Sequence, residues 1–461
     1  MGSPVKEYDA IVIGTGQAGP SLAKRLAGSG MNVAIIERNQ FGGTCVNTGC
    51  TPTKALVASA YAARMVARAS DFGVVVDGPV RVDVKRVKAR MEAIFTLSTR
   101  GVERSLRNTD RCTVYQDHAR FISAREISVA NETLRAEKIF INVGGRALIP
   151  DIPGLDQVDY LTNSSILKLD VLPPHLIVIG GSYIGLEFAQ IYRRFGSKVT
   201  VIEMASRLIP REDEDVSNAV ADILQREGIE LRLNACCLGV AKRGTDIVVN
   251  LNCESGAPEV VGTHLLLAVG RRPNTDDLGV EKASIAKDEK GFIQVDNQLR
   301  TNVPGIWALG DCNGKGAFTH TSYNDFEIVA ANLLDNDERR VSDRIVAYSL
   351  YTDPPLGRVG LTEAEVRKSG RSALISTMAM EDVSRAFEKG ESLGFMKILV
   401  DKETSEILGA SILGIGGDEV IHCILDLMYA KAPYTVMQRA MHIHPTVSEF
   451  IPTMLGDLTP L

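Results

Sequence analysis

The sequence has 461 residues, enough for about three domains of ordinary size. Its apolar fraction of 45% indicates a well-cored globular protein, and its net charge of −6 argues against a general nucleic-acid binder, which would carry a basic face. No apolar run approaches the ~20 residues needed to cross a membrane, and no secretory signal precedes the first predicted strand. We therefore expect a cytoplasmic protein with neither membrane nor nucleic-acid partners.

Eight cysteines are too few and too scattered for a secreted disulfide framework. Four stand alone and are predicted to pack as small apolar side chains: Cys112, Cys253, Cys312 and Cys423. Cys236 and Cys237 are neighbours in a predicted strand, so they point to opposite faces and are also predicted to pack; no metal site is expected. Cys45 and Cys50 remain, and in a reducing compartment such a well-spaced pair is more often catalytic than structural.

The first predicted unit runs from Tyr8 to Glu37 as an apolar strand, a glycine turn, a helix, a second apolar strand and an acid. The turn has the pattern G-x-G-x-x-G, with Gly14, Gly16 and Gly19. Such glycines let the backbone approach a pyrophosphate at the positive end of the helix, and the acid accepts hydrogen bonds from a ribose. The segment therefore predicts a dinucleotide-binding βαβ unit; a turn that merely closes a sheet is the alternative.

The next segment, GGTCVNTGCTPTK, places Cys45 and Cys50 at the start of a predicted helix whose first turn suits Pro52. The helix dipole pushes a thiol in this position toward the thiolate. Lys54 follows Cys50 by four residues and so lies on the same face of the helix, where it can hold positive charge. The segment predicts a redox-active or nucleophilic pair, although the spacing alone leaves a structural pair open.

The βαβ pattern recurs over residues 176–203, and its separation of 23 positions between the first glycine and the acid equals that of the first copy. The turn reads GGSYIG, with Gly180, Ser182 and Gly185, and the acid is Glu203. Ser182 replaces the usual middle glycine; its hydroxyl can donate to a phosphate, but it hinders the closest backbone approach. Two copies in register predict two nucleotide-binding domains.

Two segments after the second βαβ unit have distinct sequence patterns. A predicted strand runs into Gly310 and Asp311 in TNVPGIWALGDCNG. Taken alone, an acid there is more often a turn or cap residue than a ligand-binding one. From about residue 344 strand and helix patterns alternate without a glycine fingerprint, which predicts a third, α+β domain.

GGTCVNTGCTPTK resembles the active-site motif of the class I pyridine nucleotide–disulfide oxidoreductases, which include glutathione reductase, lipoamide dehydrogenase and mercuric reductase, and the resemblance covers essentially the whole chain. It implies an α/β fold with two Rossmann-like dinucleotide-binding domains, for FAD and NAD(P), and a C-terminal α+β dimerisation domain. The implied divisions are the first part of the FAD domain (1–150), the NAD(P) domain (151–272), the central return segment of the FAD domain (273–343) and the dimerisation domain (344–461).

The resemblance also assigns cofactor-binding residues. FAD would be held by Gly14, Gly16, Gly19, Glu37, Gly43, Thr44, Gly144 and Asp311. NAD(P)H would be held by Gly180, Ser182, Tyr183, Gly185, Glu203 and Gly270, with Tyr183 as a gate over the nicotinamide pocket. Glu203 favours NADH because an acid repels the 2′-phosphate of NADPH, whereas the nearby Arg207 could soften that preference.

The implied chemistry is a relay from NAD(P)H through the flavin to a Cys45–Cys50 disulfide. Cys50 would remain beside the flavin as a thiolate, and Cys45 would attack the substrate. Lys54 would lie on the flavin side with Glu187 as its partner.

The C-terminal run MHIHPTVSE resembles the family's acid–base signature. The resemblance makes His444 and Glu449 a pair that the partner subunit supplies to the Cys45 of the other chain, so a homodimer is expected. His442 has no such role and is predicted to be structural, since too few further ligands lie nearby to favour a metal site.

The acceptor is harder to assign. The segment GGSYIGLEFAQ looks like the mercuric reductase version of the NAD unit, but the chain has no terminal cysteine pair, and its last cysteine is Cys423. AFTHTSYNDFEIV looks like the corresponding run of mercuric-reductase-like, reactive-chlorine-resistance flavoenzymes. Candidate small-molecule acceptors are a disulfide, an oxidised sulfur compound, a thiol-bound metal ion or a quinone. The alternatives are a lipoamide dehydrogenase, a mercuric reductase proper, and a flavoprotein redox sensor without turnover, which would have no use for an acid–base pair.

Overall fold

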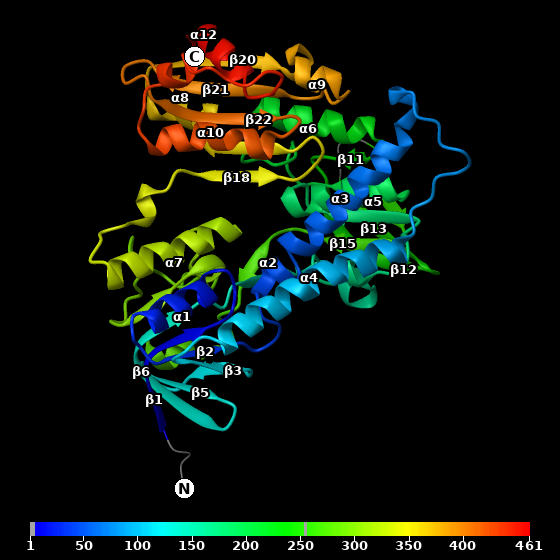
Figure 1. Cartoon of the computed structure of the whole chain (residues 1–461). Helices are drawn as coiled ribbons and strands as arrows, with labels where there is room; N and C mark the ends of the chain where they lie inside the picture. Colours follow the sequence, from blue (N-terminus) through cyan, green and yellow to red (C-terminus); the bar gives the residue numbers. More distant parts are fainter. Residues whose placement is uncertain (1–4, 253–255) are drawn as a thin grey trace.

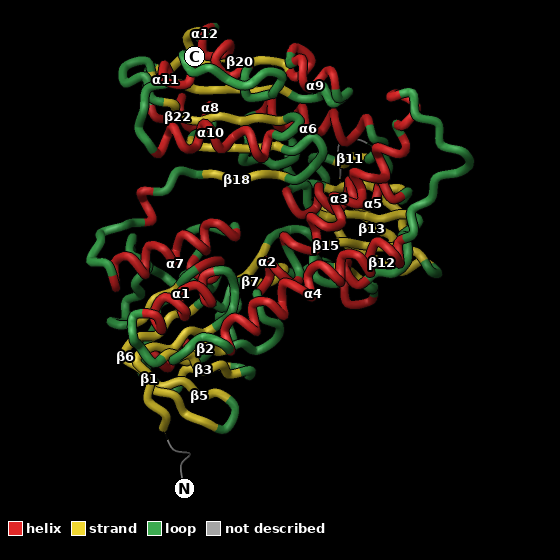
Figure 2. The backbone as a smooth tube through the Cα atoms, in the orientation of Figure 1, coloured by secondary structure: helices red, strands yellow, loops and turns green. Residues whose placement is uncertain are grey.

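The computed structural model describes residues 5–252 and 256–461 and arranges them in three regions, each built around its own sheet (Figures 1 and 2). The solitary Cys253 lies outside the described residues. The regions meet where the long helices α3 and α4 reach from the lower region of Figure 1 toward the region on its right. None of the described helices combines the length and the apolar character needed to cross a membrane.

The first region contains a seven-stranded sheet in the order β3-β2-β1-β6-β5-β4, with β17 pairing in parallel on β6. Its strands are β1 (Val5–Ile13), β2 (Val33–Ile36), β3 (Cys112–Tyr115), β4 (Ala119–Phe121), β5 (Glu126–Val129), β6 (Glu132–Ile141) and β17 (Ile306–Ala308). Its helices are α1 (Ala18–Gly28), α2 (Gly43–Asn47), α3 (Cys50–Ala67), α4 (Val84–Arg107) and α7 (Thr319–Leu334). The chain therefore leaves this sheet and returns to it after a long excursion.

The second region repeats the design with a five-stranded parallel sheet in the order β11-β10-β9-β15-β8. Its elements are β8 (Tyr160–Leu161), β9 (His175–Ile179), α5 (Tyr183–Phe195), β10 (Lys198–Ile202), α6 (Glu214–Arg226), β11 (Glu230–Arg232) and β15 (His264–Leu267). A three-stranded antiparallel sheet adjoins it, with β12 (Cys236–Arg243), β13 (Asp246–Asn252) and β14 (Glu259–Gly262). The two crossings between the regions pair as β7 (Gly145–Ala147) and β16 (Arg271–Pro273).

Glycine is required at corresponding positions of both βαβ turns. A Cβ on Gly19 would lie 2.1 Å from the carbonyl oxygen of Gly14. A Cβ on Gly185 would likewise lie 2.1 Å from the carbonyl oxygen of Gly180. Contacts this short are impossible, so each helix can pack this closely against its strand only without a side chain there.

The third region is a six-stranded antiparallel sheet in the order β18-β19-β22-β21-β20-β23. Its strands are β18 (Ala347–Leu350), β19 (Leu356–Gly360), β20 (Ala373–Ala379), β21 (Phe395–Asp401), β22 (Ile407–Leu413) and β23 (Thr459–Pro460). Its helices are α8 (Glu363–Ser369), α9 (Ser384–Glu388), α10 (Gly417–Tyr429), α11 (Thr435–Gln438) and α12 (Phe450–Gly456). The predicted fold class is confirmed; the divisions at 150/151, 272/273 and 343/344 stay predictions.

The cysteines outside the proposed redox pair behave largely as small packing residues. Cys312 is buried, and Cys112, Cys237 and Cys423 are partly buried. Cys236 is exposed, so the packing prediction is wrong for this residue. The reason is the alternation of strand β12, which turns one member of the vicinal pair outward.

A buried lysine joins the second and third regions. The Lys397 side chain is only 1% exposed, and its Nζ lies 3.0 Å from a carboxylate oxygen of Asp213, 2.8 Å from Asp215 and 3.4 Å from Glu363. The carboxylates raise the pKa of Lys397, although burial opposes them. One cation thus compensates several acids at the junction.

Lys397→Met should lower the free energy of unfolding by up to about 3–5 kcal/mol, because it removes the nearest cation of the buried Asp213 carboxylate. Urea denaturation followed by circular dichroism measures the change. Lys402→Met is the matched control, since Lys402 is exposed just past the end of the same strand. Equal unfolding midpoints for the two variants would contradict the prediction.

Candidate active site

A cavity of about 1330 Å³ opens between the three regions. It gathers most of the residues predicted to hold FAD or to carry the chemistry. Those that line it are Gly14, Gly16, Glu37, Gly43, Thr44, Cys45, Cys50, Lys54, Gly144, Tyr183, Glu187 and Asp311. Among the described residues, those predicted sites that lie outside its lining are Gly19, Gly180, Ser182, Gly185, Glu203, Gly270, His444 and Glu449.

The first βαβ turn has the form of a nucleotide cradle. The Glu37 carboxylate is buried and accepts hydrogen bonds from the backbone N–H and the hydroxyl of Thr15 (3.0 and 2.5 Å) and from the backbone N–H of Asn39 (2.8 Å). The buried amide nitrogen of Asn142 has no partner within the described residues and lies next to Gly16. An unpaired donor beside a glycine turn is what an incoming phosphate or ribose oxygen would satisfy.

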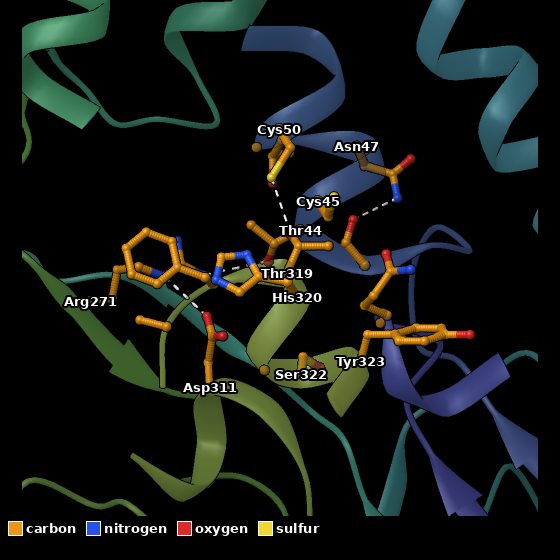
Figure 3. Close-up of a pocket in the computed structure, with 18 of the residues that line it drawn as sticks. Thr44, Cys45, Asn47, Cys50, Arg271, Asp311, Thr319, His320, Ser322 and Tyr323 are labelled. Carbon is orange, nitrogen blue, oxygen red and sulfur yellow. Dashed lines mark hydrogen bonds and ion pairs between the residues drawn. The ribbon is translucent and has the colours of Figure 1, made fainter. Parts of the chain in front are cut away.

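Two further features extend this cradle along the cavity. Gly43 has φ +62°, and a Cβ on it would lie 2.7 Å from the Cα of Gly16, so the start of α2 approaches the first turn closely. At the opposite side the Asp311 carboxylate lies 3.5 Å from Nε of Arg271 (Figure 3). Burial raises the pKa of Asp311, and Arg271 opposes that rise. The residues present therefore fit an extended dinucleotide such as FAD.

Cys45 and Cys50 project into the cavity from consecutive helices, α2 and α3 (Figure 3). Both are free thiols in this structure. The hydroxyl of Thr319, at the start of α7, lies 3.1 Å from the Cys50 sulfur. Sequence analysis missed Thr319, because nothing in its own segment marks it as a partner of a cysteine 269 positions away.

The two thiols have opposite acidities. A hydrogen bond from Cys45 lowers the pKa of Cys50 to about 6, against the opposing effect of burial; Thr319 and Lys54 lower it further. The same hydrogen bond, together with burial, raises the pKa of Cys45 far above its usual value. These opposite shifts favour an arrangement in which Cys45 keeps its proton and Cys50 is the thiolate.

Lys54 and Glu187 form the ion pair that the resemblance implied. The lysine Nζ lies 2.7 and 2.8 Å from the two carboxylate oxygens, and Glu187 is only 7% exposed. Glu187 also accepts a hydrogen bond from the backbone N–H of Tyr351 (3.1 Å), whose ring lies 4.3 Å from the lysine nitrogen. Lys54 is thereby fixed near Cys50 with much of its charge compensated.

An aromatic cluster surrounds Tyr183 and was not predicted. Its ring meets the edges of Phe318 and Tyr348, at centroid distances of 6.2 and 5.6 Å. The hydroxyls of Tyr183 and Tyr348 donate to the same oxygen of the buried Glu212, at 3.0 and 2.6 Å. Burial and this carboxylate raise the pKa of Tyr183, so the tyrosine stays neutral.

The second βαβ turn repeats the first in detail. The Glu203 carboxylate accepts hydrogen bonds from the backbone N–H groups of Gly181 (2.6 Å) and Ala205 (2.8 Å), which aim it at the turn. Ser182 caps helix α5 in an extended conformation, and its side chain makes no capping hydrogen bond. The guanidinium of Arg207 donates to the carbonyls of residues 210 and 212. Glu203 therefore has the same backbone hydrogen bonding as Glu37 in the first turn.

His444 and Glu449 lie together but away from the cysteines of their own chain. Nδ1 of His444 lies 3.0 Å from both carboxylate oxygens of Glu449, which leaves Nε2 pointing away from the pair. The His444 side chain is 74% exposed. An oriented histidine with an open second nitrogen is suited to proton transfer with a group outside its own chain.

Two βαβ turns of the nucleotide-binding form, a cavity lined by the first of them and a thiol pair of unequal acidity are the features of a flavin-dependent oxidoreductase that exchanges electrons with pyridine nucleotides and disulfides. The family described as pyridine nucleotide-disulphide oxidoreductase matches residues 8–325, and its dimerisation domain matches residues 346–455. The chain belongs to this family. It is an enzyme that uses FAD and NAD(P)H and forms a homodimer.

Similar proteins cover nearly the full chain. The probable pyridine nucleotide-disulfide oxidoreductase RclA of Escherichia coli is 36% identical over 99% of this chain and 100% of its own. A structure described as the Cu(II) complex of the HOCl-induced flavoprotein disulfide reductase RclA superposes with a TM-score of 0.89 at 35% identity, over 98% of this chain and 99% of that one. A mercuric reductase of Streptomyces lividans is 32% identical (96% and 94% covered), and a dihydrolipoyl dehydrogenase of Thermus scotoductus is 33% identical (96% and 96%).

Glu203→Arg should shift the preference from NADH toward NADPH by about 10- to 100-fold, because it removes a charge-assisted acceptor for the ribose and supplies a cation for the 2′-phosphate. The ratio of kcat/KM for the two nucleotides measures the shift. Glu203→Gln keeps an acceptor for the Gly181 amide and should give an intermediate ratio. An unchanged ratio in Glu203→Arg would remove Glu203 from nucleotide recognition.

Proposed function

We propose that this enzyme passes electrons from NADH to the Cys45–Cys50 pair and from there to a thiol-reactive acceptor, which is a disulfide, an oxidised sulfur compound or a thiol-bound metal ion. The observation that carries the proposal is that Cys45 and Cys50 enter one cavity from consecutive helices, together with the Lys54–Glu187 ion pair. When bound, FAD carries the electrons between the nicotinamide and the cysteines. All predicted FAD- and NAD-binding residues keep their assigned roles in this proposal.

Because the two thiols differ in acidity, we assign the two cysteines different roles. Cys50, the more acidic thiol, remains in the cavity as a thiolate. Cys45 keeps its proton and so needs a general base before it can attack an acceptor. His444, held by Glu449 through Nδ1, is a suitable base when a partner subunit presents it.

The relatives support the choice of acceptor class. The similar E. coli protein is described as a disulfide reductase and was solved as a Cu(II) complex, and another relative is a mercuric reductase. All of these acceptors present a sulfur atom or a metal ion that a thiolate can attack or bind. We therefore place a Cu(II)–thiol complex and a small disulfide first among the acceptors to be assayed, with Hg(II) and a quinone next.

The proposed chemistry requires both cysteines. Cys50→Ala should still bind FAD, lose the long-wavelength thiolate-to-flavin absorbance after two-electron reduction, and lose turnover about a thousandfold or more, as loss of an essential catalytic residue does. Anaerobic NADH titration and turnover assays measure these effects, with Cys236→Ala as the control because Cys236 is an exposed cysteine outside the cavity. Persistence of the absorbance in Cys50→Ala would overturn the assignment.

The same assays separate the alternatives. Robust oxidation of dihydrolipoamide with NAD would support a dihydrolipoamide dehydrogenase instead. A flavin that is reduced by NADH without turnover of any acceptor would support a redox sensor.

Whether His444 of one chain acts on Cys45 of the other is tested by mixing two variants that are each expected to be inactive, Cys45→Ser and His444→Gln. Each mixed dimer would contain one site with both native residues, so an equal mixture should recover about a quarter of wild-type turnover. Turnover after co-refolding or subunit exchange is the measurement, and each variant alone is the control. No recovery in verified mixed dimers would place the histidine and the cysteine of one site in the same chain.

A further inference from the structure

The Cys50 sulfur has a hydrogen-bonding neighbour from a distant part of the chain. The Thr319 hydroxyl lies 3.1 Å from it, and Figure 3 shows the two side chains pointing toward each other across the cavity. With a protonated thiol either atom can donate, but with a thiolate only the threonine can. The geometry is therefore suited to a Cys50 that carries negative charge.

The start of helix α7 holds Thr319 firmly in this position. Phe318, the residue before it, stacks on the rings of Tyr348 and His320, at centroid distances of 5.3 and 5.4 Å. The Thr321 hydroxyl accepts from the backbone N–H of Phe318 and donates to its carbonyl, at 3.2 and 2.7 Å. Because these contacts already hold the backbone on either side of Thr319, its hydrogen bond to the sulfur costs little additional conformational entropy.

The charged neighbours of Cys50 do not replace this hydrogen bond. Lys54 lowers the pKa of Cys50, but Glu187 lies within 2.8 Å of the lysine nitrogen and acts in the opposite direction. The ring of Tyr351 lies near Cys50, and its centre is 4.3 Å from the lysine nitrogen. The Thr319 hydroxyl also lowers the pKa of Cys50, and it lies within hydrogen-bonding distance of the sulfur.

We propose that Thr319 is a further catalytic residue, whose hydroxyl donates to the Cys50 sulfur and stabilises the thiolate that forms when the Cys45–Cys50 disulfide is opened. In that step two electrons from NADH and one proton break the S–S bond, leaving a thiol on Cys45 and a thiolate on Cys50. The inference rests on the function proposed above and adds to it the donor that keeps the second sulfur anionic.

The test measures the acidity of Cys50 without any turnover. In a Cys45→Ser background no disulfide forms, and the serine keeps a hydroxyl beside Cys50. The pH dependence of iodoacetamide alkylation at Cys50, followed by peptide mass spectrometry, then gives its pKa. Thr319→Val keeps the shape of the side chain without the donor and should raise that pKa by about one to two units. Thr319→Ser should restore the original value.

Thr319→Ala is the second variant in case valine disturbs the helix start, and bound FAD is measured in every sample to verify the fold. An unchanged pKa in folded Thr319→Val or Thr319→Ala, or an equal shift in Thr319→Ser, would overturn the role of Thr319. That failure is distinguishable from failure of the proposed function, which would appear as full turnover in Cys50→Ala with Thr319 intact.

Discussion

The Glu187 carboxylate is the point on which the active site depends, because it connects all three regions. It lies on α5, binds Lys54 of α3, and accepts the backbone N–H of Tyr351 just beyond β18. Loss of one partner from a fully buried ion pair costs about 3–5 kcal/mol, and less here because a third of the Lys54 side chain is exposed. The larger consequence is geometric: the helix that begins at Cys50 is held against the second nucleotide-binding unit.

The two βαβ units orient their acidic side chains in nearly the same way. In each, an acid at the end of the second strand accepts hydrogen bonds from backbone N–H groups on both sides, as Glu37 and Glu203 do. The acid is thus oriented before any nucleotide arrives, which lowers the entropy lost on binding. The copies differ in their relation to the cavity: Glu37 lines it, whereas Glu203 lies outside it. The first unit therefore contributes its turn and its acid to the cavity, whereas the second contributes the start of its helix, including Tyr183 and Glu187.

Sequence reasoning could identify the parts of the site that are coded locally. The spacing of glycines and acids gave the βαβ units, and the helical offset of Lys54 from Cys50 placed both on one face. The resemblance supplied the distant partner Glu187. Thr319, Arg271 and Glu212 could not be predicted in the same way. Each is a common residue type whose role arises from a tertiary contact between distant segments, and a single sequence contains no local signal for such a contact.

The C-terminal segment around His444 exposes large apolar side chains, as a surface that packs against a second chain would. Met441 and Ile443 are 99% and 80% exposed, an unusual state for large apolar side chains so close to the ordered His444–Glu449 pair. In a homodimer formed through this region they would be covered, and the histidine beside them would be brought to the interface. Each chain by itself provides an acidic Cys50 and a Cys45 that retains its proton, but its own base points into solvent. In the function proposed above, dimerisation would therefore do more than stabilise the fold, because it would bring the base of one chain to the Cys45 of the other.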